Sequence, residues 1–72
     1  MAEMIAYGRV EKVKFEEKND TIVIVNDGRK RIPISVPQDH YQKLISKNNG
    51  SFMLREVEVY RENGMISIKV FD

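Results

Sequence analysis

The final third of the chain holds the pattern that most constrains its fold. Apolar and polar residues alternate on both sides of an Asn63-Gly64 pair, a dipeptide favoured in two-residue type I′ hairpin turns. A turn at that point gives two aliphatic pairs on one face, Val57 with Val70 and Val59 with Ile68. A slip of one residue would move both pairs to the opposite face. The segment is therefore predicted to be a β-hairpin of defined register.

The first half of the chain contains strand-like runs that are separated by turn residues. The first run covers residues 4–15, and its alternation slips because Val10 and Val13 are both apolar. A bend or bulge near Gly8 would bring both valines to the inside. After a polar loop, residues 21–25 are apolar on both faces. These features predict two strands, the first of them curved.

A third strand and a helix are predicted next. Residues 26–28 (Asn-Asp-Gly) indicate a hairpin turn, and residues 32–36 alternate between apolar and polar side chains. Pro33 has no backbone N–H, so this strand is expected at a sheet edge or an irregularity. A short helix should begin at Pro37 and end near Gly50. Its narrow apolar stripe consists of Tyr41, Leu44 and Ile45.

This order, three strands, a short helix and two strands, is that of an OB-like, five-stranded β-barrel. The expected fold class is therefore all-β with one short helix, and an SH3-like barrel is the alternative. A chain of 72 residues is long enough for one core only, so residues 1–72 are expected to form a single domain. Because the chain has no cysteine, its stability must come from aliphatic packing rather than from disulfides or thiolate metal sites.

Three segments resemble the small single-OB-fold proteins and, more distantly, the S1-like group. They are the opening at residues 8–10 (Gly-Arg-Val), the turn at residues 26–28 and the strand at residues 57–60 (Val-Glu-Val-Tyr). The Gly-Asp pair expected before the fourth strand of S1 domains is replaced here by Gly50-Ser51-Phe52. The resemblance implies an OB fold that binds oligonucleotides across strands two and three. It assigns no role to an individual residue.

Nothing in the sequence predicts an enzyme, a cofactor or a metal site. The single histidine, His40, lies at the helix start without an acid partner on the same face. The four glycines are scattered over turns, unlike a phosphate-binding loop. The carboxylates of residues 16–20 lack the spacing of a calcium loop. Apolar runs are shorter than the ~20 residues of a membrane span and the start is unlike a signal peptide, so a cytoplasmic protein with no membrane partner is expected.

Basic residues gather in two places, which indicates contact with nucleic acid. One group lies on the first strand and the other at the second turn, and an OB-like barrel would place both beside one groove. The candidate residues for binding single-stranded DNA or RNA are Arg9, Lys12, Lys14, Arg29, Lys30, Arg31 and Tyr60. For stacking on bases the candidates are Tyr7 and Tyr60, and more weakly Phe15 and Phe71. The interleaved glutamates and the net charge of +1 fit equally well an ordinary, thermophile-like solvated surface.

Docking of a protein is the alternative function. Ile22 and Ile24 are the candidate docking residues, because one face of residues 21–25 would be the usual OB binding surface. If these isoleucines are exposed, they form an apolar patch for a partner or a second copy. If the helix or the curled first strand covers them, they belong to the core. The edges of the first and last strands are further candidate sites for strand addition.

These features together predict a non-catalytic binding module. We expect a small accessory subunit of a larger replication, transcription or RNA-processing complex. It would touch single-stranded nucleic acid weakly through its basic hairpin while docking a larger protein through its aliphatic strand. The alternative is a pure protein-interaction subunit, monomeric or dimeric, that uses the aliphatic strand or a sheet edge and binds no nucleic acid.

Overall fold

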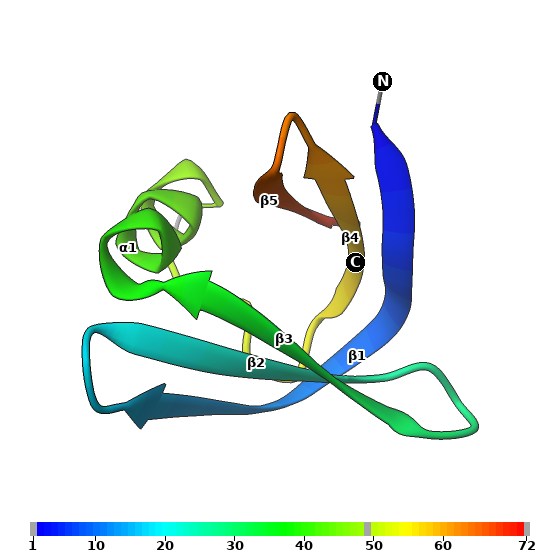
Figure 1. The fold of residues 1–72 in the computed structure, drawn as a ribbon. Coiled ribbons are helices and arrows are strands. Elements are labelled where there is room, and N and C mark those ends of the chain that lie inside the picture. Colours follow the sequence, from blue (N-terminus) through cyan, green and yellow to red (C-terminus); the bar gives the residue numbers. More distant parts are fainter. Residues whose placement is uncertain (1, 49, 72) are drawn as a thin grey trace.

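The computed structural model describes residues 2–48 and 50–71 of the chain. Its elements are β1 (Glu3–Glu16), β2 (Asp20–Asn26), β3 (Arg31–Pro37), α1 (Gln38–Lys47), β4 (Glu56–Glu62) and β5 (Met65–Val70). The strands form one antiparallel sheet in the order β3-β2-β1-β4-β5. Figure 1 shows β1, β2 and β3 as one layer, from which the sheet curls through β1 into β4 and β5. The prediction of a mostly β chain with one short helix is confirmed.

The long strand β1 lies at the centre of the sheet and joins its two halves. Residues 3–9 pair with β4, and residues 9–16 pair with β2. The strand bends between these halves (Figure 1). The two outer strands are β3 and β5, so the edge expected on the first strand is limited to the part of β1 before Arg9, which pairs with β4 but not with β2. Pro33 lies on the outer strand β3, as predicted for a residue that cannot donate to a ladder.

Gly8 lies at the bend of β1, where a side chain would not fit. Its φ is +152°, and a Cβ would lie 2.0 Å from the carbonyl oxygen of Asn26. The pairing register shifts on both sides of this point, once in each half of the strand. Val10 is fully buried and Val13 packs against the core. The predicted bend is therefore confirmed, and it allows β2 to approach β1 closely at Gly8.

The β4–β5 hairpin has the predicted register. Its pairs include Val57 with Val70, Glu58 with Lys69, Val59 with Ile68 and Tyr60 with Ser67. The turn residues Asn63 and Gly64 have φ values of +53° and +77°, and both are positive as a type I′ turn requires. Local turn chemistry and cross-strand packing thus agree on one arrangement.

The helix α1 covers the gap between β3 and β5. It begins directly after Pro37 and its C-cap is Asn48, close to the predicted limits. Nε2 of His40 bonds the carbonyl oxygen of Ile66, and Nδ2 of Asn48 donates to that of Ile68. A side chain of α1 and that of its C-cap residue thereby occupy two carbonyl acceptors of the outer strand β5. Within the described residues no ladder joins β3 to β5, so the sheet is open there and the predicted barrel is not confirmed.

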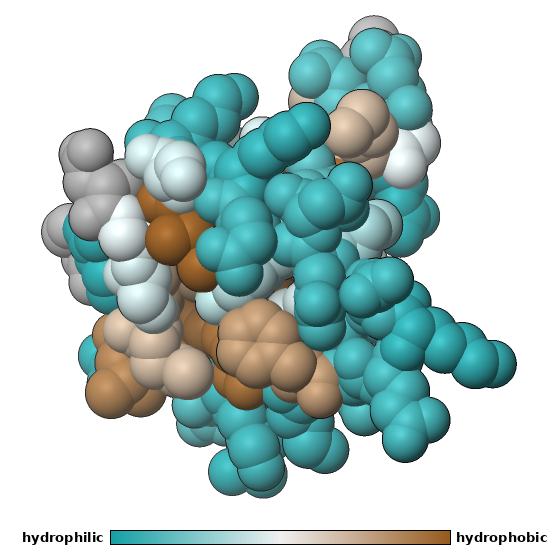
Figure 2. Space-filling view, turned by 90° about the vertical axis from the view of Figure 1, so that its left-hand side faces the viewer, coloured by the Kyte–Doolittle hydropathy of each residue, from teal (hydrophilic) through white to brown (hydrophobic). Residues whose placement is uncertain are grey.

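The hydrophobic core lies between the curled sheet and α1. Phe52, from the segment between α1 and β4, is its largest fully buried side chain and packs edge-on against Tyr41, with 5.5 Å between ring centroids. Phe15 contacts the same tyrosine at 5.7 Å, although it is 61% exposed. Figure 2 shows hydrophobic atoms gathered in the lower part of the side that carries α1. Aliphatic residues of all five strands complete the core around these rings.

Candidate binding surface

The lysines of β1 and the isoleucines of β2 lie side by side on one face of the sheet. Lys12 is paired with Ile24, and Lys14 is paired with Ile22. The alternating residues of β2, including Val23, are fully buried and point to the core. Since successive side chains of a strand point to opposite faces, these two pairs project outward, away from α1. The structure thus brings two of the predicted nucleic-acid residues, Lys12 and Lys14, onto the same surface as the predicted docking residues.

Strand β3 completes this surface. The register pairs Pro33 with Ile24, Ser35 with Ile22 and Arg31 with Asn26. We call this outward side the lysine–isoleucine face, and its residues are Lys12, Lys14, Ile22, Ile24, Arg31, Pro33 and Ser35. Its two isoleucines are half-buried, and its other side chains are exposed. At one end Leu54, which is 63% exposed, shares a shallow hollow of about 460 Å³ with Lys12 and Ile24.

Glu11 organises the charges at the Arg31 end of the face. Its carboxylate accepts hydrogen bonds from Nδ2 of Asn26 at 3.0 Å and from Nε of Arg31 at 2.5 Å. These two bonds, the first one most, lower the pKa of Glu11 below its ordinary value. The charge of Arg31 is thereby partly balanced. Lys12 and Lys14 form no ion pair with any residue that the structure describes.

The lowered pKa of Glu11 predicts a pH-dependent contribution to stability. A carboxyl group whose folded pKa lies below its unfolded pKa stabilises the fold above the unfolded value, and this contribution is lost as the pH falls through the folded value. We expect Glu11→Gln to lower the melting temperature at neutral pH. The difference in melting temperature between the variant and the unmodified protein should shrink as the pH falls below about 4.5, the ordinary pKa of a glutamate side chain. Thermal unfolding followed by circular dichroism across this pH range checks it, and a difference that is independent of pH would contradict it.

The other two predicted basic residues, Arg29 and Lys30, lie in the turn between β2 and β3. Their backbone N–H groups both donate to Oδ1 of Asp27 at 2.9 Å, and these bonds lower the pKa of Asp27. Both side chains are exposed. The turn predicted at residues 26–28 is confirmed, and it extends the lysine–isoleucine face with two cations beyond the Arg31 end.

Arg9 and Tyr60 occupy other positions. Arg9 pairs with Asn26 in the sheet, but its guanidinium lies 3.7 Å from the carboxylate of Glu56 on β4. Tyr60 lies on β4, where its hydroxyl donates to Glu58 at 3.1 Å, and this bond raises the pKa of Tyr60. Tyr60 is half-buried and belongs to the half of the sheet built by β4 and β5. The structure does not bring it together with the lysines.

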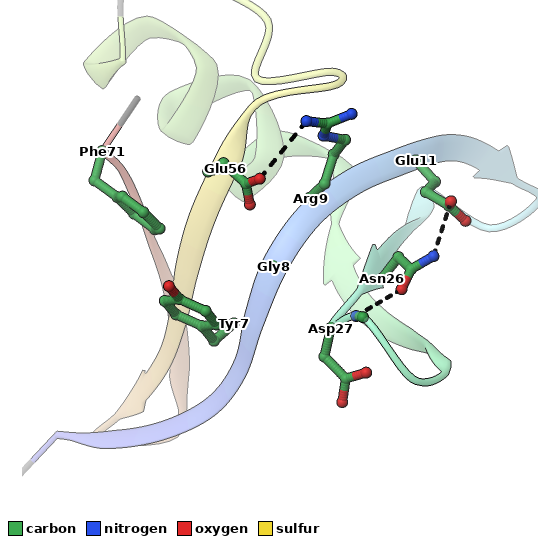
Figure 3. Close-up of a pocket in the computed structure, with 9 residues that line it drawn as sticks. Tyr7, Gly8, Arg9, Glu11, Asn26, Asp27, Glu56 and Phe71 are labelled. Carbon is green, nitrogen blue, oxygen red and sulfur yellow. Dashed lines mark hydrogen bonds and ion pairs between the residues drawn. The ribbon is translucent and has the colours of Figure 1, made fainter.

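The most exposed aromatic pair joins β1 to the end of β5. Tyr7 and Phe71 stack with 5.6 Å between ring centroids and 18° between planes, and they are 52% and 45% exposed. Figure 3 shows the two rings on the β4 side of β1, beside Arg9 and Glu56. No pattern in the sequence indicates that these two rings stack, because the residues are far apart in the chain and meet only through the register of β1, β4 and β5.

The described part of the chain contains no group of three or more histidine, cysteine, aspartate or glutamate side chains placed to hold a metal ion. His40 bonds a backbone carbonyl of β5, a structural contact rather than a partner for a nucleophile. Among the residues that the structure describes, no helix has both the length and the apolar character needed to cross a membrane. No family model, curated protein or solved structure significantly matches this chain.

Proposed function

We propose that this chain is a non-catalytic binding module of the OB type and that its lysine–isoleucine face binds single-stranded nucleic acid. The strand order supports the OB assignment, because in that barrel the first strand pairs with both the second and the fourth, and a helix precedes the fourth. The gap between β3 and β5 corresponds to the seam of such a barrel, covered here by α1. An SH3-like barrel accounts less well for a helix of ten residues at this point.

The register of lysines opposite isoleucines is the observation that carries this proposal. The outer face of strands two and three is where OB folds bind their ligands, and Lys12 and Lys14 border it on one side. A strand of nucleic acid would direct its phosphates toward these lysines and toward Arg29 and Lys30, while its bases cover the isoleucines. The half-buried isoleucines supply apolar contact to the bases in place of aromatic stacking.

The arrangement supports weak, salt-dependent binding. Four cations form no ion pair within the described residues: Lys12 and Lys14 on this face, and Arg29 and Lys30 in the turn that adjoins it. Four phosphate contacts on a single strand correspond to a slope of about −3 in log affinity against log salt. Such binding suits an accessory subunit of a replication, transcription or RNA-processing complex, in which other subunits supply most of the affinity.

The test is fluorescence anisotropy with a labelled oligothymidylate, titrated at low and at moderate salt. We expect Lys12→Glu combined with Lys14→Glu to weaken binding at least tenfold, because two phosphate contacts become repulsive. The matched control is Lys43→Glu with Lys47→Glu, which makes the same change of charge on exposed positions of α1. A flat titration, or equal losses in both double variants, would contradict the proposal.

An acidic, apolar segment of another protein is the second candidate for the same face. It is favoured by the exposed edges of Ile22 and Ile24 and by the lack of an aromatic ring among the residues that define this face. The variant Ile24→Lys separates the two candidates. For the oligonucleotide it exchanges one apolar contact with the bases for attraction to phosphate, so binding should change less than threefold. A peptide of alternating leucine and glutamate should bind at least tenfold more weakly, because its leucine side chains lose their apolar partner.

A further inference from the structure

The first half of β1 has one edge without a partner strand. Residues 3–9 pair with β4 on one side, whereas pairing with β2 begins only at Arg9. In the part of the chain that the structure describes, no strand lies along the other side of residues 3–7. In an antiparallel ladder every second residue directs its N–H and C=O groups away from its partner. A row of main-chain donors and acceptors is therefore available along this edge.

The packing at Gly8 explains why the edge is open. The backbone of Asn26 and Asp27 lies against Gly8 so closely that no Cβ fits. Beyond this contact β2 ends, and the turn that follows is held by the bonds of Asp27 to Arg29 and Lys30. The β2–β3 hairpin thus leaves β1 at Gly8 and does not return to it.

Two hollows with two lining residues in common lie beside the open edge. The smaller one, about 340 Å³, is lined by Met4, Ile5, Ala6, Tyr7, Asp27 and Ile32. The larger one, about 580 Å³, shares Tyr7 and Asp27 with it and extends to Arg9 and Phe71. Figure 3 shows Tyr7 on the β4 side of the β1 ribbon and Asp27 on the opposite side. The smaller hollow is apolar except for Asp27, and Met4 beside it is 47% exposed.

One carboxylate beside these hollows has no ion pair. Of the three carboxylates that border the larger hollow, Glu11 is paired with Arg31 and Glu56 with Arg9, whereas Asp27 forms no ion pair within the described residues. Oδ1 of Asp27 already accepts two backbone hydrogen bonds, and its second oxygen has no partner among the described residues. The ring of Tyr7, stacked on Phe71, is a fixed aromatic surface opposite this carboxylate. An aromatic ring and a carboxylate together favour a cation such as guanidinium.

We propose that an extended peptide of a partner protein adds as a strand along residues 3–7 of β1 and places an arginine or lysine side chain between Tyr7 and Asp27. Main-chain hydrogen bonds to the open edge give the peptide its position, and alternate side chains give specificity. The inward side chains pack on Ile5 and Ile32, which are half-buried at the rim of the core. The outward basic side chain lies opposite Tyr7.

This surface adjoins the lysine–isoleucine face at the β2–β3 turn but is built on another part of β1, and the proposal does not rest on the function proposed for that face. The lysine–isoleucine face belongs to the second half of β1 and to β2 and β3, whereas the open edge belongs to the first half of β1. A protein could therefore dock at residues 3–7 while nucleic acid occupies the other surface. The carboxylate of Asp27, which forms no ion pair within the described residues, disfavours nucleic acid there because it repels phosphate.

The test uses blocked heptapeptides in which valine and threonine alternate around a central arginine. Binding is followed through the backbone amide signals of the whole protein by nuclear magnetic resonance. We expect the arginine peptide to shift and protect the amides of residues 3–7 and to bind at least tenfold more tightly than the same peptide with a central glutamate. Methylation of one backbone nitrogen of the peptide that donates a hydrogen bond to β1 should also weaken binding at least tenfold, because that bond is lost.

Two variants of the protein complete the test. Tyr7→Ala should reduce the preference for arginine over glutamate at least fivefold, whereas Met65→Ala, an equally exposed residue at the β4–β5 turn, should leave it unchanged. The proposal is overturned if no peptide binds at millimolar concentration, if the N-methylated peptide binds equally well, or if the shifts map to the lysine–isoleucine face. The proposal is also overturned if sedimentation shows a dimer in which the amides of residues 3–7 are protected, because the edge would then bind a second copy of the chain.

Discussion

Replacing Gly8 with alanine should leave the folded form of the protein only marginally stable at room temperature. The new Cβ would lie 2.0 Å from the carbonyl oxygen of Asn26 and 2.9 Å from the Cα of Asp27, and the φ of +152° is itself unfavourable for a residue with a side chain. Backbone strain and overpacking each cost about 1–3 kcal/mol. The combined loss of about 4 kcal/mol approaches the ~5 kcal/mol expected for the total stability of so small a domain.

The control for this prediction is Gly28→Ala. Gly28 also has a positive φ, +97°, but no atom lies within 4 Å of the position of its Cβ. This variant should lose only the backbone term, about 1–2 kcal/mol. Urea unfolding followed by circular dichroism compares the two directly. Equal unfolding midpoints for the two variants would show that the approach of β2 to β1 is not as tight as the structure has it.

Phe52→Ala is the second change with a large expected effect. The ring is fully buried against Tyr41, although it comes from a segment outside the helix and strands. Removal of a buried phenyl group costs about 3–5 kcal/mol, partly from lost transfer free energy and partly from the cavity that remains. We therefore expect the folded form to be marginal, with a melting temperature more than 10 °C lower, as scaled for a domain of about 70 residues.

Phe15→Ala serves as the matched control. Phe15 contacts the same tyrosine edge-on, but it is 61% exposed, so its removal leaves little cavity and should cost about 1 kcal/mol. Thermal unfolding of both variants gives the comparison. If Phe52→Ala were no more destabilised than Phe15→Ala, Phe52 would not hold the segment before β4 against the core.

Features that depend on neighbouring residues could be predicted from the sequence. The register of β4 and β5 followed from Asn63-Gly64, because a two-residue turn leaves one way to pair the valines. The helix followed from the spacing of Tyr41 and Leu44 after Pro37. The bend of β1 was also predicted, since Gly8 precedes a slip in the apolar alternation.

The candidate sites could be predicted only in part. The sequence predicted that Lys12, Lys14 and Arg31 lie on neighbouring strands, and the register of β1, β2 and β3 places them on one face of the sheet. Their position beside Ile22 and Ile24 was not foreseen, and the two sets had been assigned to different tasks. Tyr60 was expected to accompany them, but the central place of β1 puts β4 on the other half of the sheet.

Local periodicity and turn chemistry were thus enough to define the strands, the helix and the hairpin turns, because each depends on residues that are close in the chain. The order of the strands depends on how far β1 bends before it meets β2, and this is decided by packing at Gly8. That packing places the lysines beside the isoleucines, stacks Tyr7 on Phe71 and leaves residues 3–7 with an open edge. Contacts between residues so distant in sequence depend on the whole sheet at once, and no short pattern in the chain encodes them.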